Sequence, residues 1–86
     1  KDAADILDEI TKTLSQVEPF AAAAIKEGLE GLSRRLNVSL GQINLPLRLA
    51  VTGRTMGPDL LEIISFLGRE GVLARLKRAK QLFIQT

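Results

Sequence analysis

The 86-residue sequence contains no cysteine and no histidine. Without cysteine, it can form neither a disulfide nor a thiolate metal site. Without histidine, it lacks the commonest general base and the commonest metal ligand at neutral pH. A glycine-rich loop with the phosphate-binding spacing and its lysine is also missing. We therefore predict that this chain carries no catalytic residue and no metal site.

Long apolar runs are missing as well, because no stretch approaches the roughly 18 residues that a membrane span needs. No signal-peptide pattern opens the chain, which begins with Lys1 rather than Met. Length and composition fit one domain, residues 1–86. We expect this domain to be part of a larger cytoplasmic protein, to be monomeric and to make no contact with a membrane.

Aromatic residues are scarce: the chain has no tryptophan, no tyrosine and three phenylalanines. We assign Phe20, Phe66 and Phe83 to the core.

Charge is unevenly spread although the net charge is only +2. Residues 1–32 hold seven acids and three lysines, a net charge of −4. Residues 33–86 hold nine basic residues and three acids, a net charge of +6. This asymmetry has two interpretations: one end of the domain faces an anionic partner, or the basic residues offset the dipoles of helix C-termini.

Apolar residues recur every three or four positions, the period of one helical face, and no alternating pattern indicates a strand. Asp2 can cap the first helix. Pro19 suits the first turn of the second helix, which should end near Asn37. We predict an all-α fold, a small bundle of four to five helices of which two are short. The predicted helices span about residues 2–17, 19–37, 46–51, 58–67 and 69–83.

The middle of the chain, LPLRLAVTGRTMGPDLLEII at residues 45–64, combines prolines, glycines and arginines. We predict that residues 38–45 form a connector with one turn around 39–43, because Pro46 forces Leu45 into an extended conformation. A short helix then starts at Pro46 and ends at a left-handed Gly53. Residues 54–57 form a turn, Pro58 opens the next helix, and Gly68 ends it.

The acids Asp2, Asp5, Asp8 and Glu9 cluster near the N-terminus. All fall in the first turns of the predicted helix, where negative charge is favourable and faces water. We interpret them as structural rather than as metal ligands.

Three features of residues 45–64 are compatible with binding. Backbone N–H groups of residues 59–61 would be unpaired at a helix start and could receive an anionic or polar group. Gly53 and Gly57 permit close approach of another backbone. Arg48 and Arg54 offer forked donors for base edges or phosphates. The alternative is that Arg48 is an ordinary surface residue and the turn merely connects, which composition alone favours.

Three motifs together resemble a known family: PLRLAVTG at residues 46–53, GPDLLEIISFLG at 57–68 and RLKRA at 75–79. Their order and spacing are similar to the C-terminal, anticodon-binding end of bacterial glutamyl-tRNA synthetase. The resemblance covers the whole chain in helix order and is sharpest over its second half. It implies an all-helical anticodon-binding subdomain, separate from the class I catalytic domain that binds ATP and glutamate.

The resemblance also implies roles for individual residues. Arg48, Gly57, Pro58 and Leu60 match the positions that approach anticodon bases in the family. Some members have threonine before this proline, so Gly57 lacks a side-chain hydroxyl contact. Independently of the resemblance, Arg54, Arg75 and Arg78 are expected to contact tRNA phosphates, whose negative charge their side chains can neutralise.

The function implied is recognition of a tRNA anticodon loop as the C-terminal module of a glutamate–tRNA ligase. The tRNA would accept glutamate, with a glutamine acceptor tRNA as a second candidate. We expect no cofactor in this chain, while ATP and Mg²⁺ would bind the parent's catalytic domain. An alternative is a helical protein-interaction module whose positive end docks an acidic partner.

Overall fold

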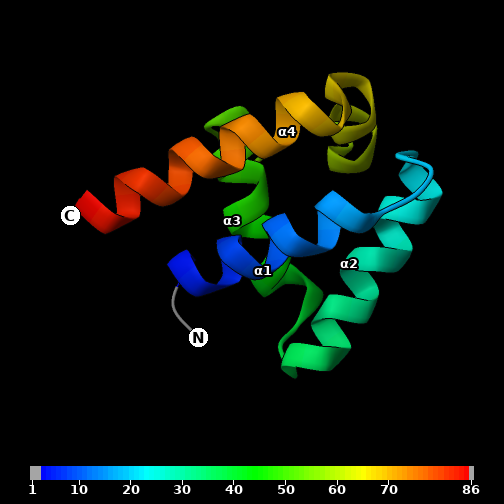
Figure 1. Cartoon of the computed structure of the whole chain (residues 1–86), viewed down its shortest axis with the longest axis horizontal. Helices are drawn as coiled ribbons and strands as arrows, with labels where there is room; N and C mark the ends of the chain where they lie inside the picture. Colours follow the sequence, from blue (N-terminus) through cyan, green and yellow to red (C-terminus); the bar gives the residue numbers. More distant parts are fainter. Residues whose placement is uncertain (1–2, 86) are drawn as a thin grey trace.

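The computed structural model describes residues 3–85, with side chains described for residues 4–82. The chain folds into four helices: α1 (Ala3–Gln16), α2 (Ala22–Leu36), α3 (Leu40–Thr52) and α4 (Leu60–Gln85). Figure 1 shows α4 along the upper edge of the molecule, passing in front of α3 and above α1, and no strand occurs in the described range. This confirms the predicted all-α bundle. The predicted cap Asp2 lies outside the described residues. No helix of residues 3–85 is long and apolar enough to cross a membrane.

The first two helices bury apolar residues spaced three or four positions apart, as the periodicity predicted, and one helix boundary is shifted. Asn37 has left-handed backbone angles (φ 55°, ψ 45°) and ends α2, as predicted. Pro19, however, does not open α2. The Glu18–Pro19 peptide is cis, and the Ala21 N–H donates to the Pro19 carbonyl at 2.9 Å. The Ile25 N–H then donates to the Ala21 carbonyl, so the first helical hydrogen bond starts at Ala21.

The predicted connector before Pro46 is wrong, because α3 is continuous from Leu40 to Thr52 with Pro46 inside it. A capping box starts this helix: Ser39 Oγ accepts from the Gln42 N–H at 3.2 Å, and Gln42 Oε1 accepts from the Ser39 N–H at 2.8 Å. Pro46 removes only one helical donor, and the packed face of the helix outweighs that loss. Gly53 ends α3 in the left-handed region (φ 75°), as predicted.

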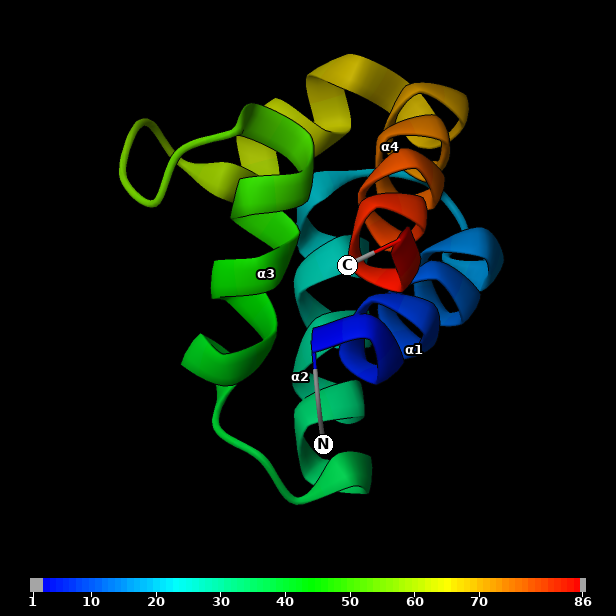
Figure 2. The same ribbon diagram turned by 90° about the vertical axis from the view of Figure 1, so that its left-hand side faces the viewer.

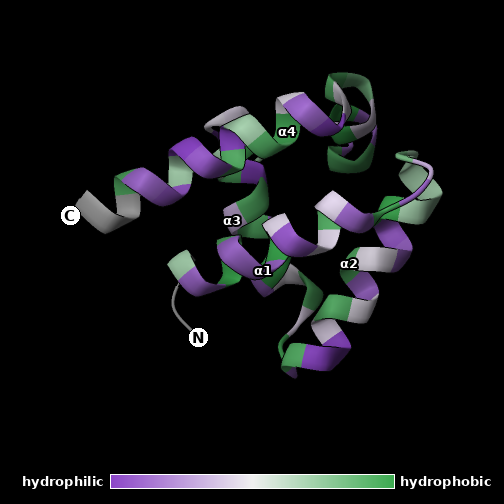
Figure 3. Ribbon diagram, in the orientation of Figure 1, coloured by the Kyte–Doolittle hydropathy of each residue, from purple (hydrophilic) through white to green (hydrophobic). Residues whose placement is uncertain are grey.

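The predicted stop at Gly68 is confirmed as a kink inside α4, with φ 80° and ψ 165°. Arg69 follows the kink and ties it to the end of α1. Its Nη1 donates to the Leu14 carbonyl at 2.9 Å, its Nη2 lies 3.2 Å from Glu18 Oε2, and its guanidinium stands 5.0 Å from the centre of the Phe20 ring. The segment of α4 before the kink is mostly apolar (Figure 3).

Every helix contributes buried residues to one apolar core. These are Ile6, Leu7, Ile10, Leu14, Val17, Ile25, Leu29, Leu32, Ile43, Leu47, Val51, Leu60, Ile64, Val72 and Leu76.

The assignment of all three phenylalanines to the core is wrong for Phe66, which is 90% exposed. Phe66 lies two residues beyond the buried Ile64, and two residues turn a helix by about 200°, to the opposite face. Phe20 is half-buried beside Arg69. The Phe83 side chain lies outside those described.

Candidate functional site

The turn between α3 and α4 protrudes from the helical body (Figure 2). One hydroxyl organises its first part. Thr52 Oγ1 lies 2.8 Å from the Arg48 carbonyl oxygen and accepts the Arg54 N–H at 3.1 Å. Arg54 therefore lies at the start of the turn, where it is exposed. Sequence reasoning did not single out Thr52, although a threonine hydroxyl often accepts the backbone N–H two residues further on.

Arg48 joins α3 to the end of this turn. Its Nη1 donates to the Pro58 carbonyl at 3.0 Å. Gly57 has φ 153°, and a Cβ atom added there would lie 3.4 Å from Arg48 Nη1. The half-buried Arg48 side chain is therefore held against the backbone of residues 57–58. The fold brings together three of the four predicted base-contacting residues, Arg48, Gly57 and Pro58.

The start of α4 differs from the sequence-based expectation. The helix begins at Leu60 rather than Pro58, and Asp59 acts as its N-terminal cap. Asp59 Oδ1 accepts the Leu61 N–H at 3.0 Å, and the Asp59 carbonyl accepts the Ile63 N–H at 3.2 Å. We predicted that the backbone N–H groups of residues 59–61 would be unpaired. This prediction is wrong for Leu61, because the Asp59 carboxylate accepts its N–H.

Beside Arg48 lies a hollow of about 240 Å³ between α2, α3 and the start of α4. Leu60, the fourth predicted base-contacting residue, lines it and is 6% exposed. The residues that line this hollow, which we call the α3 pocket, are Lys26, Leu29, Leu40, Asn44, Arg48, Asp59, Leu60 and Leu61.

Sequence reasoning missed the polar members of the α3 pocket other than Arg48, namely Lys26, Asn44 and Asp59. Asn44 could have been found, because it precedes Arg48 by four residues, one helical turn. The mistaken break at Pro46 hid that spacing. Lys26 comes from α2 through tertiary packing, for which the sequence offers no signal.

The three predicted phosphate-contacting arginines have different surroundings. Arg75 is exposed, and its Nη1 donates to the Val51 carbonyl near the end of α3 at 3.1 Å. Such a contact satisfies a helix C-terminal carbonyl. Arg54 is exposed in the neighbouring turn, so these two arginines and Arg48 gather at the C-terminal end of α3. Arg78 is exposed one helical turn beyond Arg75.

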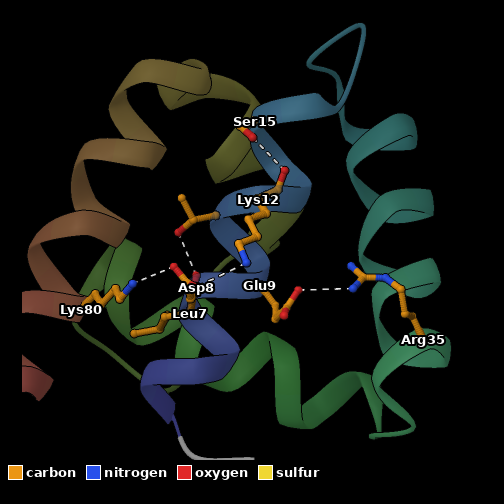
Figure 4. Close-up of polar contacts among 8 residues, drawn as sticks. Leu7, Asp8, Glu9, Lys12, Ser15, Arg35 and Lys80 are labelled. Carbon is orange, nitrogen blue, oxygen red and sulfur yellow. Dashed lines mark hydrogen bonds and ion pairs between the residues drawn. The ribbon is translucent and has the colours of Figure 1, made fainter.

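Two acids of α1, Asp8 and Glu9, form ion pairs with basic side chains (Figure 4). Asp8 Oδ1 accepts from Lys80 Nζ at 2.7 Å, and Asp8 Oδ2 lies 3.6 Å from Lys12 Nζ. Glu9 pairs with Arg35 at 3.3 Å. The hydrogen bond and positive charge of Lys80, assisted by Lys12, lower the pKa of the Asp8 carboxyl below its ordinary value. Among residues 3–85, no group of three or more His, Cys, Asp or Glu could hold a metal ion.

Comparison with known proteins identifies similar chains. The profile of a family described as "Anticodon binding domain" matches residues 1–80. The glutamate–tRNA ligase of Moorella thermoacetica is 49% identical over 77 residues, 90% of this chain and 16% of that protein. A glutamate–tRNA ligase of Staphylococcus xylosus is 38% identical over 74 residues, 86% of this chain and 62% of that sequence.

A solved structure is similar as well. The crystal structure of a glutamate tRNA ligase from Elizabethkingia meningosepticum superimposes with a TM-score of 0.86 at 29% identity. The match covers 91% of this chain and 15% of that one. This chain therefore spans only about a sixth of the length of that ligase and of the Moorella relative.

Proposed function

The chain belongs to the anticodon binding domain family, and from this premise we propose that it recognises the anticodon loop of a tRNA as one domain of a glutamate–tRNA ligase. The observation that carries the proposal is the 3.0 Å hydrogen bond from Arg48 to the Pro58 carbonyl. This bond joins Arg48 of the first motif to Pro58 of the second, ten positions later in the chain, so that both motifs form one surface beside a pocket.

The chemistry of this surface suits an unstacked RNA loop. An anticodon loop presents bases that proteins read by stacking and by hydrogen bonds to their edges. Arg48 has five N–H donors, of which the hydrogen bond to the Pro58 carbonyl uses one and restrains the position of the guanidinium. In the proposal Arg48 contacts a base, the backbone of Gly57 and Pro58 allows close approach, and Leu60 provides an apolar floor.

Phosphate contacts would come from the arginines around this surface. Arg54, Arg75 and Arg78 are all exposed. Phosphate contacts position an RNA without reading its sequence. We therefore assign affinity to these three side chains and base preference to Arg48.

The activity of the whole protein is part of the proposal. The relatives are named glutamate–tRNA ligases, and such an enzyme joins glutamate to its tRNA at the expense of ATP. ATP and Mg²⁺ would bind in a catalytic domain outside these 86 residues, and this chain would supply no catalytic residue. We propose a monomeric, cytoplasmic enzyme whose tRNA accepts glutamate, with glutamine acceptor tRNA as a second substrate to be tested.

The test is binding of the full-length protein to anticodon stem-loop RNAs in which one anticodon base at a time is replaced. We expect the Kd to rise by at least about tenfold for the wrong base at one or more positions. Replacing a stem base pair by another base pair is the control and should change little. Binding that ignores every anticodon base would overturn the proposal and favour the acidic-partner alternative.

A further inference from the structure

Phe66 is the most exposed large apolar side chain that the structure describes. It is 90% exposed, and the next such side chain, Met56, is 81% exposed. It is also one of only three aromatic residues in the chain. Phe66 lies on the first segment of α4, between the turn that follows α3 and the kink at Gly68. Its ring contributes nothing to the core, and aromatic side chains are enriched at the centres of protein interfaces.

The surroundings of Phe66 are acidic, in contrast to the rest of this half of the chain. Glu62 precedes Phe66 by four residues, so the two side chains are neighbours on the helix surface. Residues 55–68 contain two acids, Asp59 and Glu62, and no basic residue, although residues 33–86 have a net charge of +6. Glu62 is exposed and forms none of the four ion pairs recorded within residues 3–85. This face of α4 therefore presents an aromatic ring beside a negative charge.

The molecule itself shows which group binds such a combination. At the kink, the Arg69 guanidinium stands 5.0 Å from the centre of the Phe20 ring, and its Nη2 lies 3.2 Å from Glu18 Oε2. The ring face attracts the cation, and the carboxylate pairs with the same charge. Phe66 and Glu62 present the same two groups to solvent. Their chemistry fits an arginine side chain supplied by a partner.

We propose that the exposed face of α4 around Glu62 and Phe66, which we call the Phe66 face, docks a separate protein that places an arginine against the Phe66 ring. The inference goes beyond the proposed function and does not depend on it. A nucleic acid does not suit the Phe66 face, because the Glu62 carboxylate repels phosphates.

The position of the Phe66 face favours a partner on a different chain. In Figure 1, α1 begins and α4 ends toward the left of the molecule, whereas the first segment of α4 lies at the right. A longer protein that contains this domain continues from those left-hand ends. The Phe66 face lies at the opposite end of the molecule, where a separate protein can approach it.

The experiment introduces the photo-crosslinking amino acid p-benzoylphenylalanine at position 66 of the full-length protein in its native cells. The control places the same amino acid at Gln81, an exposed position of α4 beyond the kink. Mass spectrometry identifies the cross-linked peptides. A cross-link within one chain keeps the mass of the monomer, and a cross-link to a second copy doubles it. Charge is tested by Glu62→Lys and, as a control, by Glu27→Lys at an exposed acid of α2.

We expect position 66, but not position 81, to cross-link to another protein in a segment that contains an arginine. Glu62→Lys should lower this yield about tenfold, because it places two positive charges together, and Glu27→Lys should leave it unchanged. A synthetic peptide of the cross-linked segment should bind the full-length protein. Replacing its arginine by glutamine should weaken binding about tenfold, since the cation no longer meets the ring and the carboxylate.

A yield at position 66 no higher than at position 81 would overturn the inference. A cross-link to RNA, to the same chain or to a second copy would overturn it as well. The same holds for a protein cross-link that Glu62→Lys does not change, and for a peptide that binds equally well without its arginine. None of these outcomes affects the proposed function, which fails only if the wild-type protein ignores every anticodon base.

Discussion

Charged side chains behave differently in two regions of the molecule. Around α1, acids and bases neutralise each other: Asp8 pairs with Lys80, and Glu9 with Arg35 (Figure 4). At the end of α3, arginines bind backbone carbonyls instead of carboxylates. Arg48 donates to Pro58.

Arg75 donates to the Val51 carbonyl in the same region. The four ion pairs recorded within residues 3–85 include none of the candidate RNA-contacting arginines, which are Arg48, Arg54, Arg75 and Arg78. A carbonyl oxygen orients a guanidinium without cancelling its charge, so this end of the domain keeps a positive field. The charges around α1 therefore stabilise the fold through ion pairs, whereas the arginines at the end of α3 remain available to bind an anion.

The largest effect should come from weakening the packing of α3, the helix that carries the arginines of the second region. Leu47 is fully buried on the inner face of α3, one residue before Arg48. Leu47→Ala should lower the free energy of unfolding by about 2–5 kcal/mol, because it leaves a cavity. Leu49→Ala, on the same helix but 42% exposed, should cost much less. Chemical denaturation measures both, and equal losses would mean that α3 does not pack as described.

A smaller effect should come from the start of α3. Ser39→Ala removes the hydroxyl that accepts the Gln42 N–H and should destabilise the domain by about 1 kcal/mol. Ser15→Ala is the control, because the Ser15 hydroxyl is exposed and donates only to the Lys12 carbonyl. Equal stability of the Ser39→Ala variant and the wild type would show that the helix does not depend on its capping box.

The positive charge of the second region can be tested through the salt dependence of RNA binding. With about three phosphate contacts, log affinity for a stem-loop should fall against log salt with a slope near −2, at about 0.7 per contact. Arg54→Gln should make the slope shallower by about 0.7 and weaken all loops alike. Arg34→Gln removes the same charge at the exposed end of α2 and should leave the slope unchanged. Identical slopes for all three proteins would remove Arg54 from the interface.

The smallest effect concerns the internally paired region and depends on pH. Because Lys80 lowers the pKa of Asp8, the pair stabilises the fold above the ordinary aspartate pKa, and this stability is lost as pH falls through the lowered value. Asp8→Asn should be slightly less stable at neutral pH and should lose less on acidification.

Thermal unfolding between neutral and acidic pH measures this difference. Glu70→Gln is the matched control, because the exposed Glu70 forms none of the ion pairs recorded in residues 3–85. Parallel pH profiles for Asp8→Asn and the wild type would contradict the assigned role of Asp8.

Much of the fold follows from local rules that the sequence displays. Apolar periodicity predicted the helices, and the predicted helix ends at Gly53 and Gly68 proved to be a helix end and a kink, because glycine adopts their left-handed backbone angles without strain. Pro46 was misread because a local rule about proline was given more weight than the capping box at Ser39 and the packing of α3. Phe66 was misplaced because its residue type was considered without its position on the helix.

The candidate site was only partly predictable, because the sequence displays local motifs but not tertiary packing. Arg48, Gly57 and Pro58 stand out as a motif, and the fold joins them. Lys26 and Asn44 reach the pocket only when α2 packs beside an unbroken α3. That juxtaposition depends on tertiary contacts, which a single sequence does not display.

The most direct test of the proposed division of roles is the base preference of Arg48→Ala in the full-length protein. Binding is measured across stem-loops substituted at one anticodon position at a time, beside Arg48→Lys and Arg54→Gln. Arg48→Ala should cost about 1–3 kcal/mol and relax discrimination at one position, and lysine should restore little because it lacks the planar fork. If Arg48→Ala weakens every loop by the same factor and the order of preference is unchanged, Arg48 is a phosphate-binding or structural residue and the account is wrong.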